Sequence, residues 1–393
     1  MKRNVAIGTG MLTLLVVLGL GQSVLQRTAA AQAKGSVQAP RFEVDPMWPK
    51  PLPNHWVYGN VIGVGVDKND HVYIIHRGAG SLEPKEIYAA ANPPQSECCV
   101  PAPPVVEFDA EGNFVRAWGG PGKGYEWPES NHGITPDTKG NLFIGGNGGN
   151  DGHILKFTQD GKFVKQFGFA YASAGSNDMF AFNKVAKVSL DEGANEAYVS
   201  DGYGNKRVAV IDMETGKIKR YWGAYGNKPD DTPLGPYNPD APVAQQFRNP
   251  VHCADLSHDG FVYVCDRVND RLQVFTRDGK FVKEIFVEKT TKGDGAVWDI
   301  AFSKDAAQKY FYMADGSNEK VHVFERQSLT ELTAFGDGGR QPGQFYAVHS
   351  IATDSKGNIY TTETYEGKRL QKFVYKGLSA VTKAEQGVVW PKK

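Results

Sequence analysis

A two-part pattern of turns and β-rich runs recurs through most of the chain, and it limits the fold more than any other feature of the sequence. The first part is a polar turn followed by a run rich in Val, Ile and Tyr. The second part is a turn of the Asp-Gly-Lys type followed by a run that ends in an aromatic residue and glycine. Six first parts can be counted, and they begin at residues 67, 137, 191, 257, 304 and 354. Each copy therefore encodes about four short strands joined by hairpin turns.

Four strands per copy, at a spacing of 47 to 70 residues, predict an all-β fold, a six-bladed β-propeller. One blade cannot bury both faces of its sheet, so the blades must close into a ring. The sixth copy lacks an outer strand, and we expect residues 56–59 to supply it. A single domain of residues 34–393 replaces the two or three domains that a length of 393 residues suggests. The blades are expected at residues 61–120, 131–168, 183–223, 249–286, 295–336 and 346–377.

The charge balance of the chain excludes two classes of protein. Lys and Arg together number 44, and Asp and Glu also number 44, so the formal net charge is zero. A nucleic-acid-binding protein would be basic, and an acidic disordered segment would be strongly negative. We therefore expect no nucleic-acid partner.

Residues 1–33 have the composition of an export signal. Lys2 and Arg3 precede an apolar stretch at residues 5–21, and Ala31-Gln32-Ala33 forms a small-x-small cleavage pattern. Cleavage after Ala33 by the Sec route would place the mature protein in a periplasm or outside the cell, without stable membrane insertion. The alternative is an uncleaved anchor, because about 17 apolar residues is close to the shortest span of a bilayer.

Three of the nine histidines occupy one column of the repeat. His132, His252 and His349 each lie eight residues before the turn glycine of their copy. The three copies are the second, fourth and sixth, which are related by about 120° in a six-bladed ring. Because the first strand of each blade lines the central channel, we expect the three imidazoles to converge on the axis at one depth.

Three converging imidazoles predict a metal site. Chance would produce such a column roughly one time in a hundred, so we favour a metal site over three unrelated channel histidines. Three histidines leave a tetrahedral ion one open position, as in catalytic zinc sites. Zinc (Zn2+) is the first choice, and iron, cobalt and copper are alternatives because imidazole discriminates weakly among these metals. The equivalent positions of the other copies predict an apolar channel wall at Ile62, at about Val185 and at Trp298.

The histidines and three further stretches give the sequence a resemblance to a known family. Over about residues 40–377 it resembles the NHL-repeat six-bladed propellers, and among them the peptidyl-α-hydroxyglycine α-amidating lyases. The matching histidine contexts are Asn-His-Gly-Ile at His132, Pro-Val-His-Cys-Ala at His252 and Ala-Val-His-Ser-Ile at His349. The resemblance implies that these three histidines hold the catalytic zinc.

The same resemblance implies three catalytic residues. Arg77 lies in a His-Arg-Gly stretch, Tyr203 in the Ser-Asp-Gly-Tyr-Gly-Asn-Lys-Arg stretch of residues 200–207, and Arg267 in the Asp-Arg-Val-Asn-Asp-Arg stretch of residues 266–271. The implied substrate is a small molecule or a peptide, and the implied reaction cleaves a carbinolamide, a peptidyl- or N-acyl-α-hydroxyglycine, into an amide and glyoxylate. Tyr203 would take or relay a proton, and the two arginines would grip the substrate carboxylate. We expect no hydroxylating domain in this chain, so a separate enzyme would have to make the substrate.

The sequence departs from the family pattern at several positions. Where the family has Met-Pro-His-Asp, residues 347–350 read Ala-Val-His-Ser, and the missing Asp, which is associated with a structural calcium, argues against a Ca2+ site. Gly204 stands where the family has a cysteine beside the tyrosine, which removes that disulfide. Asn131 replaces the proline before the first histidine.

Two other functions remain open. A related metal-dependent hydrolase or lyase could act on another small substrate, because fold and metal do not determine the substrate. A non-catalytic NHL propeller could bind a peptide or a carbohydrate, with the histidines, Tyr203 and both arginines in structural roles. A calcium-dependent lactonase is disfavoured, since such propellers use carboxylates and amides in the channel.

Four cysteines allow three pairings. Cys253 and Cys265 flank a predicted hairpin, and they face each other only if the register is right, because a slip of one residue puts them on opposite faces. Cys98 and Cys99 are adjacent in the chain. A strained bond between them, two free thiols and a bond to another chain are all open.

Overall fold

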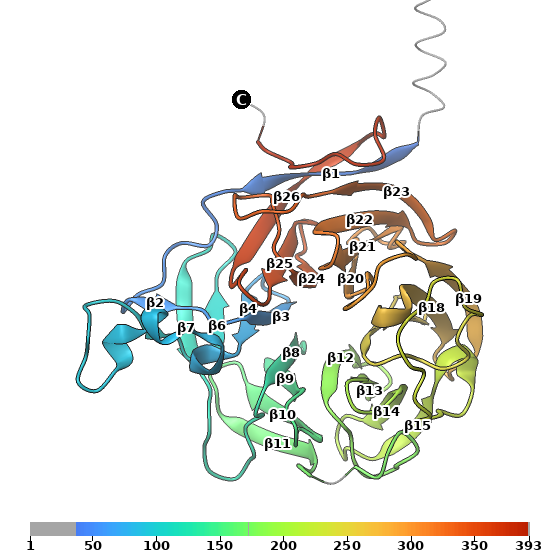
Figure 1. The fold of residues 1–393 in the computed structure, drawn as a ribbon, viewed down its shortest axis with the longest axis horizontal. Helices are drawn as coiled ribbons and strands as arrows, with labels where there is room; N and C mark the ends of the chain where they lie inside the picture. Colours follow the sequence, from blue (N-terminus) through green and yellow to red (C-terminus); the bar gives the residue numbers. More distant parts are fainter. Residues whose placement is uncertain (1–36, 172, 392–393) are drawn as a thin grey trace, which may run out of the picture.

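The structure, a computed structural model, describes residues 37–171 and 173–391. The export signal predicted for residues 1–33 lies outside this range. Within the range, strands form six four-stranded sheets arranged as a ring, so the predicted all-β, six-bladed propeller is confirmed (Figure 1). No helix in these residues has the length and apolar character needed to span a membrane.

Each of the first five blades takes its strands from the axis to the rim in chain order. The first strands of the blades contact one another around the axis. Blades one to three are built from β3 (Val61–Val66), β4 (Val72–His76), β6 (Val105–Phe108) and β7 (Phe114–Trp118), then β8 (Asn131–Pro136), β9 (Asn141–Gly146), β10 (His153–Thr158) and β11 (Phe163–Gly168), then β12 (Val185–Asp191), β13 (Glu196–Asp201), β14 (Arg207–Asp212) and β15 (Ile218–Trp222). Blades four and five are built from β16 (Val251–Leu256), β17 (Phe261–Asp266), β18 (Arg271–Thr276) and β19 (Phe281–Phe286), then β20 (Asp299–Phe302), β21 (Tyr310–Asp315), β22 (Lys320–Glu325) and β23 (Thr330–Phe335).

The sixth blade is closed by the first described strand of the chain, not by residues 56–59 as the sequence predicted. Its strands are β24 (Val348–Thr353), β25 (Ile359–Glu363), β26 (Leu370–Ala380) and, at the rim, β1 (Gln38–Asp45). β1 runs antiparallel to β26, with Val44 opposite Phe373. Residues 56 and 57 instead form the short strand β2 (Trp56–Val57), which pairs in parallel with β5 (Val100–Pro101).

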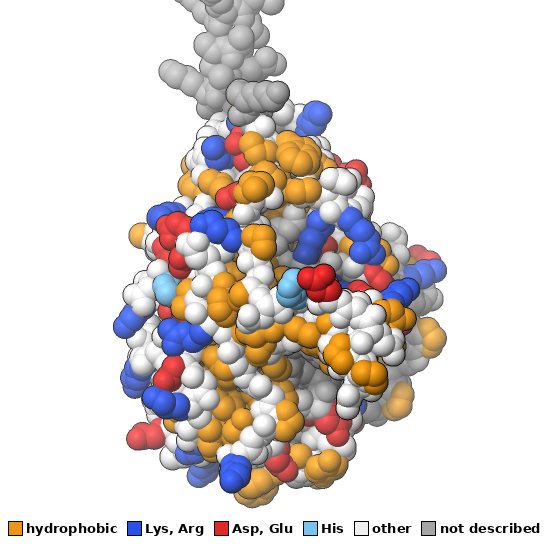
Figure 2. All heavy atoms as spheres, turned by 90° about the vertical axis from the view of Figure 1, so that its left-hand side faces the viewer, with side chains coloured by type: hydrophobic (Ala, Val, Ile, Leu, Met, Phe, Trp, Pro, Cys, Tyr) orange, Lys and Arg blue, Asp and Glu red, His pale blue; other side chains and the backbone are white. Residues whose placement is uncertain are grey.

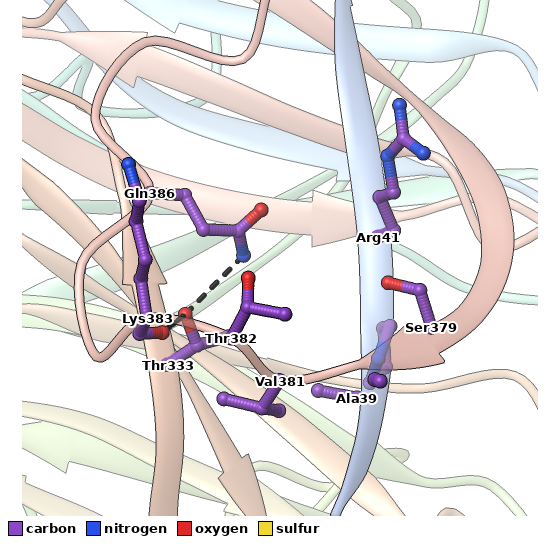
Figure 3. A pocket seen from close by; sticks show the side chains of 10 residues that line it. Ala39, Arg41, Thr333, Ser379, Val381, Thr382, Lys383 and Gln386 are labelled. Atoms are coloured by element: carbon purple, nitrogen blue, oxygen red, sulfur yellow. Dashed lines mark hydrogen bonds between the residues drawn. The ribbon is translucent and has the colours of Figure 1, made fainter. Parts of the chain in front are cut away.

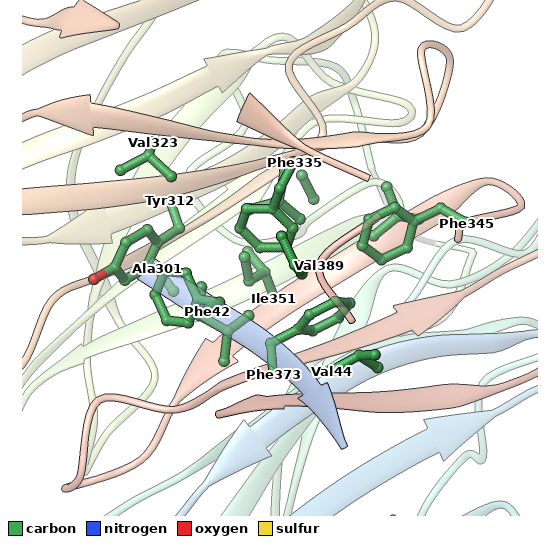
Figure 4. Packing of buried hydrophobic residues seen from close by; sticks show 14 of the residues in the cluster. Phe42, Val44, Ala301, Tyr312, Val323, Phe335, Phe345, Ile351, Phe373 and Val389 are labelled. Carbon is green, nitrogen blue, oxygen red and sulfur yellow. The ribbon is translucent and has the colours of Figure 1, made fainter. Parts of the chain in front are cut away.

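The apolar face of β1 explains why it closes the ring. Phe42 is 2% exposed and completes a core cluster shared by blades five and six (Figure 4). Its ring centroid lies 5.2 Å from that of Tyr312 and 5.5 Å from that of Phe335. Trp56 is only half-buried and packs on Phe114 of blade one, so β2 offers no comparable surface to the sixth blade.

The turn that opens the clearest copies of the repeat has one geometry. Asp137 Oδ1 accepts hydrogen bonds from the backbone N–H groups two and four residues later, and Asp354 does the same in the sixth copy. The turn glycines Gly140, Gly260 and Gly357 have φ between +81° and +85°, a region that disfavours a side chain. These recurrent residues are therefore the local cause of the repeated hairpins.

Both cysteine pairs are disulfide-bonded. Cys253 and Cys265 lie opposite each other on β16 and β17, with Cα atoms 4.8 Å apart. Cys98 and Cys99 form a bond between chain neighbours in the insertion of blade one. The 3-10 helices of the described residues are η1 (Gly78–Ser81), η2 (Pro84–Glu86), η3 (Tyr88–Ala90), η4 (Ala224–Gly226) and η5 (Arg267–Asn269).

The face of the molecule drawn in Figure 2 is mixed in character. On the face drawn in Figure 2, Lys and Arg side chains are scattered among acidic, polar and apolar ones. A groove lies at the rim where β1, β26 and the segment after β26 meet, and Arg41, Lys383 and Gln386 are among its lining residues (Figure 3). Gln386 Nε2 donates across this groove to Thr333 Oγ1 over 3.3 Å, which ties the segment to blade five.

Candidate functional site

Three histidine side chains meet at the axis of the ring. His132, His252 and His349 are each the second residue of the first strand of their blade. Each is at most 3% exposed, and their ring centroids lie 4.8–5.0 Å apart. The three can offer one ring nitrogen each such that all of these atoms lie within 4.8 Å of one another. The structure therefore brings the three predicted ligands together at one depth.

Backbone carbonyls of the intervening blades orient the three rings. Each Nδ1 bonds a carbonyl oxygen of the next blade, in the pairs His132 with Ala186, His252 with Trp298 and His349 with Ile62. The Nδ1 to oxygen distance is 2.7 Å in the first and third pairs. A carbonyl oxygen only accepts hydrogen bonds, so each Nδ1 carries the hydrogen and each Nε2 keeps its lone pair.

One residue of the channel wall lies one position away from its predicted place. The sequence alignment placed Val185 in the channel, and the structure has the Ala186 carbonyl there. Val185 pairs with Asp201, 16 residues later, whereas Val251 pairs with Asp266, 15 residues later. The hairpin of blade three is therefore one residue longer, and counting back from its turn glycine stops one position before Ala186. Ile62 and Trp298 are both buried, and Ile62 lines the channel beside the histidines.

Burial keeps the three imidazoles neutral. It lowers the pKa of each histidine well below the usual value, and neighbouring positive charge lowers each pKa further. Arg77 contributes to this second effect at His132 and His349, and Arg267 contributes at all three histidines. A neutral imidazole is the form that binds a metal ion.

These features fit a transition-metal ion. Tyr203 Oη lies 3.0 Å from Nε2 of His132 and 3.1 Å from Nε2 of His252, but a hydroxyl has only one hydrogen to donate. At least one of these two nitrogens therefore has a lone pair that Tyr203 does not satisfy. Three neutral imidazoles, each with its Nδ1–H held by a carbonyl, form the donor set of a zinc or similar ion.

Tyr203 reaches the axis from the turn between β13 and β14. Asn249 holds this turn by donating from Nδ2 to two of its carbonyl oxygens, at 2.7 and 2.8 Å. A Cβ at Gly202 would come within 2.0 Å of the Val251 carbonyl oxygen, so only glycine fits there. The strand that carries His252 thus packs directly on the turn that carries Tyr203.

Arg267 contacts Tyr203 from the end of β17. One guanidinium nitrogen donates to Tyr203 Oη over 3.2 Å, and another lies 3.3 Å from Asp294 Oδ1. The guanidinium carbon also lies 4.5 Å from the ring centroid of Trp298. The ion pair and the stacking on the indole hold Arg267 in place, while its buried Nε has no partner among the described residues.

Arg77 occupies the equivalent position in blade one. It directly follows β4, as Arg267 follows β17, and it donates to Asn147 Oδ1 over 3.0 Å. Its buried Nε likewise has no partner in the part of the chain that the structure describes. Two guanidinium groups with unpaired N–H groups near three neutral histidines suit an anion such as a carboxylate. The structure thus brings all six predicted site residues together.

Three further polar residues at this site were not predicted from the sequence. Tyr365 Oη donates to Asp294 Oδ2 over 2.9 Å, and Asn147 is the partner of Arg77. Asn147 and Tyr365 share a repeat position with the predicted tyrosine and arginines, because all five lie one or two residues after the second strand of their blade. Comparing that column across the copies would have found both residues.

Asp201 and Asp266, which the sequence indicated as structural, pair with arginines of the following strands. Asp201 Oδ2 lies 2.8 Å from Arg207 Nε, and Asp266 Oδ2 lies 2.6 Å from a terminal nitrogen of Arg271. All four side chains are fully buried. These ion pairs close the turns that carry the tyrosine and the second arginine of the site.

Comparisons with known proteins place the chain among β-propellers. Residues 153–356, just over half of the chain, match the family described as "Lactonase, 7-bladed beta-propeller". The NHL repeat-containing protein 3 of Mus musculus is 24% identical over 378 residues, which cover 90% of this chain and 89% of that protein. The propeller is thus one with NHL-repeat relatives.

Two further similarities are more limited. The peptidyl-glycine alpha-amidating monooxygenase of Mus musculus is 25% identical over 235 residues, which cover 58% of this chain but only 22% of that protein. A solved structure of a protein of unknown function from Bacteroides thetaiotaomicron has a TM-score of 0.51 at 13% identity, over 88% of this chain and 76% of that one. The second likeness concerns the fold alone.

Proposed function

This chain belongs to the family described as lactonase, seven-bladed β-propeller, and from that premise we propose that its three-histidine centre binds a catalytic zinc ion. We propose further that the protein is an exported lyase, acting in a periplasm or outside the cell, on a peptidyl- or N-acyl-α-hydroxyglycine. Its products are an amide and glyoxylate. The residues described here form six blades, so the family's description does not match the blade number of this chain.

The position of Tyr203 Oη carries this proposal. The oxygen is within 3.2 Å of two histidine nitrogens and of the Arg267 guanidinium. An ionisable oxygen between a metal site and a cation suits a substrate that has a hydroxyl group to deprotonate and a carboxylate to bind. The motifs around Tyr203 and Arg267, and the partial match to alpha-amidating monooxygenases, support the α-hydroxyglycine class.

The histidines, the arginines and Tyr203 have separate roles in the proposed reaction. His132, His252 and His349 would hold the zinc ion, which when bound would act as a Lewis acid and make the substrate hydroxyl more acidic. Arg77 and Arg267 bind the substrate carboxylate and hold the hydroxyl-bearing carbon in place. Tyr203 Oη relays the proton: it gives its own hydrogen to the departing amide nitrogen and takes the proton of the substrate hydroxyl, while Arg267 stabilises the negative charge that develops on Oη between the two transfers.

The proposed reaction needs no oxidant, but its substrate has to be made by another enzyme. The O–H and C–N bonds of the substrate break, the C=O bond of glyoxylate forms and the nitrogen gains the proton, so the cleavage needs no oxidant. Installing the hydroxyl group on the glycine carbon is an oxidation, and a separate hydroxylating enzyme supplies that substrate.

A second candidate is a metal-dependent hydrolase acting on a lactone. The family match over residues 153–356, which contain His252 and His349, favours it. In this case the three histidines would hold a metal that makes a water molecule, instead of a substrate hydroxyl, more acidic, and the two arginines would bind the carbonyl side of the ester.

Two assays on one preparation test these proposals. Protein purified without a histidine tag is analysed for metal and incubated with an N-acyl-α-hydroxyglycine, and in parallel with a γ-lactone. We expect about one equivalent of transition metal and metal-dependent release of glyoxylate, both lost in His252→Ala. His153→Ala is the matched control, because His153 is also buried, at 1% exposure, but lies on the third strand of its blade and bonds the Glu126 carbonyl.

The outcomes separate the candidates. Less than about a tenth of an equivalent of any transition metal in the wild-type protein would exclude the metal centre. A metal-loaded protein that hydrolyses the lactone and releases no glyoxylate supports the second candidate. Loss of metal in His153→Ala as complete as in His252→Ala would show that the loss reflects general unfolding.

A further inference from the structure

An ammonium–carboxylate network lies next to the histidines in the channel. Lys187 Nζ lies 2.7 Å from Asp299 Oδ1 and 3.0 Å from Asp255 Oδ2. The side chains of Lys187, Asp255 and Asp299 are 16%, 15% and 2% exposed. Lys187 and Asp299 line the same cavity as the three histidines, and the proposed reaction uses neither of them.

The network joins four blades. Lys187 is on β12 of blade three, Asp255 on β16 of blade four and Asp299 at the start of β20 of blade five. Ser350 of blade six donates from Oγ to Asp299 Oδ2 over 2.6 Å, and the backbone N–H of Ile351 donates to the same oxygen over 3.1 Å. Asp299 therefore connects the ammonium group to the strand that carries His349.

Members of the network are chain neighbours of the groups that build the histidine centre. The neighbouring pairs are Ala186 with Lys187, Trp298 with Asp299, and His349 with Ser350. The carbonyls of Ala186 and Trp298 receive the Nδ1–H groups of His132 and His252. A displacement of Lys187 or Asp299 therefore moves a carbonyl that orients a histidine ring.

The Lys187 ammonium group lies between the two carboxylates of this network. Apart from the histidines, Cys253, Asp255 and Asp299 are the one other group of three potential metal ligands found in the described residues. Cys253 is unavailable because it is bonded to Cys265. Lys187 Nζ contacts both remaining carboxylates, so the ammonium group stands where a bound ion would otherwise bridge them, and it offsets one of their two negative charges.

We propose that Lys187, together with Asp255 and Asp299, positions the metal-binding histidines, and that its ammonium group does so in place of a structural cation. This inference rests on the metal centre of the proposed function, and it assigns no chemical step to Lys187. Groups that hold metal ligands in orientation typically change metal affinity by about 10- to 100-fold when they are removed. The zinc affinity of this protein therefore depends on Lys187 and does not depend on calcium.

Zinc affinity measured by competition with a chromophoric chelator tests the proposal on the whole protein. We expect Lys187→Met to bind zinc about 10- to 100-fold more weakly than wild type. Lys156→Met is the matched control, because the Lys156 side chain is also 16% exposed and its Nζ lies 3.5 Å from Asp137 Oδ2, in an ion pair within blade two. Its zinc affinity should stay within about twofold of wild type, as should that of wild type freed of calcium.

Ser350→Ala provides a second variant if Lys187→Met does not fold. It removes one hydrogen bond to Asp299 and keeps the ion pairs, and we expect a several-fold loss of zinc affinity in a folded protein. Unchanged affinity in a folded Lys187→Met or Ser350→Ala protein, an equal loss in Lys156→Met, or a loss on removing calcium would overturn the proposal. A wild-type protein that binds no zinc would overturn the metal centre as well, whereas zinc binding without glyoxylate release would overturn only the lyase.

Discussion

Nδ1 of His349 lies 2.7 Å from the carbonyl oxygen of Ile62, and this bond joins the last blade of the ring to the first. The candidate metal centre is therefore built across the junction at which the propeller closes. β1 completes the blade that carries His349, so ring closure and the orientation of one predicted ligand depend on the same sheet.

The closing strand can be tested through its aromatic residue. Phe42→Ala removes a side chain that is 2% exposed and should lower the free energy of unfolding by about 3–5 kcal/mol. Trp56→Ala, in the segment that the sequence had indicated as the closing strand, removes a half-buried ring and should lower it by less. Urea unfolding of both variants measures the difference. A larger loss in Trp56→Ala would contradict the closing role of β1.

Tyr203→Phe separates proton transfer from metal binding. The variant keeps the ring and loses the hydroxyl group, so we expect the turnover number for glyoxylate release to fall by about 100- to 10,000-fold. Metal content should stay at the wild-type level, because three histidines supply the proposed ligands. Metal analysis and glyoxylate release are measured on the same sample. Loss of the metal in Tyr203→Phe would make the tyrosine a ligand and remove its role as proton carrier.

Arg77→Met and Arg267→Met test whether the two arginines bind the substrate carboxylate. Each variant removes a charged hydrogen-bond donor from the site, and we expect kcat/KM for an N-acyl-α-hydroxyglycine to fall by about 30-fold or more. The same variants should lose far less activity on the analogue in which a carboxamide replaces the carboxylate. Steady-state kinetics on both substrates provide the comparison. Equal losses on the two substrates would mean that the arginines do not recognise the carboxylate.

His322 makes stability depend on pH in blade five. Burial opposes its charge, but Asp315 and Glu331 outweigh burial and raise the pKa of His322 to about 9. The stabilisation is complete below the pKa of an unfolded histidine, about 6.5, and is lost as the pH rises through about 9. Because the Glu331 side chain is 41% exposed, solvent weakens its attraction to His322, and we expect this stabilisation to be about 2 kcal/mol.

Urea unfolding of wild type and His322→Gln at several pH values measures this contribution. The wild-type protein should be the more stable of the two at pH values near 6, and the difference should shrink in alkaline solution. Other titrating groups are common to both proteins and cancel in the comparison. A difference that stays constant between neutral and alkaline pH would show that His322 is not charged in the folded state.

The blade structure could be predicted because its cause is local. Turn residues such as Asp137 and Gly140 recur with the strands that they connect, so the repeat reports four-stranded units directly. Six copies then predict six blades. The same reasoning leads from one column of the repeat to three histidines around one axis, because alternate blades of such a ring are related by about 120°.

Contacts between unlike blades could not be read from the repeat. Phe42 closes the ring because it meets Tyr312 and Phe335 of blade five, and no shared pattern links these residues. Likewise, Lys187 bridges Asp255 and Asp299 because three blades present one charged side chain each to the same part of the channel. A period describes what the copies have in common, whereas these contacts depend on residues that the copies do not share. The local turns and the histidine column could thus be predicted from the sequence alone. The closing strand and the position of the ammonium group beside the histidines were determined by packing between blades in three dimensions.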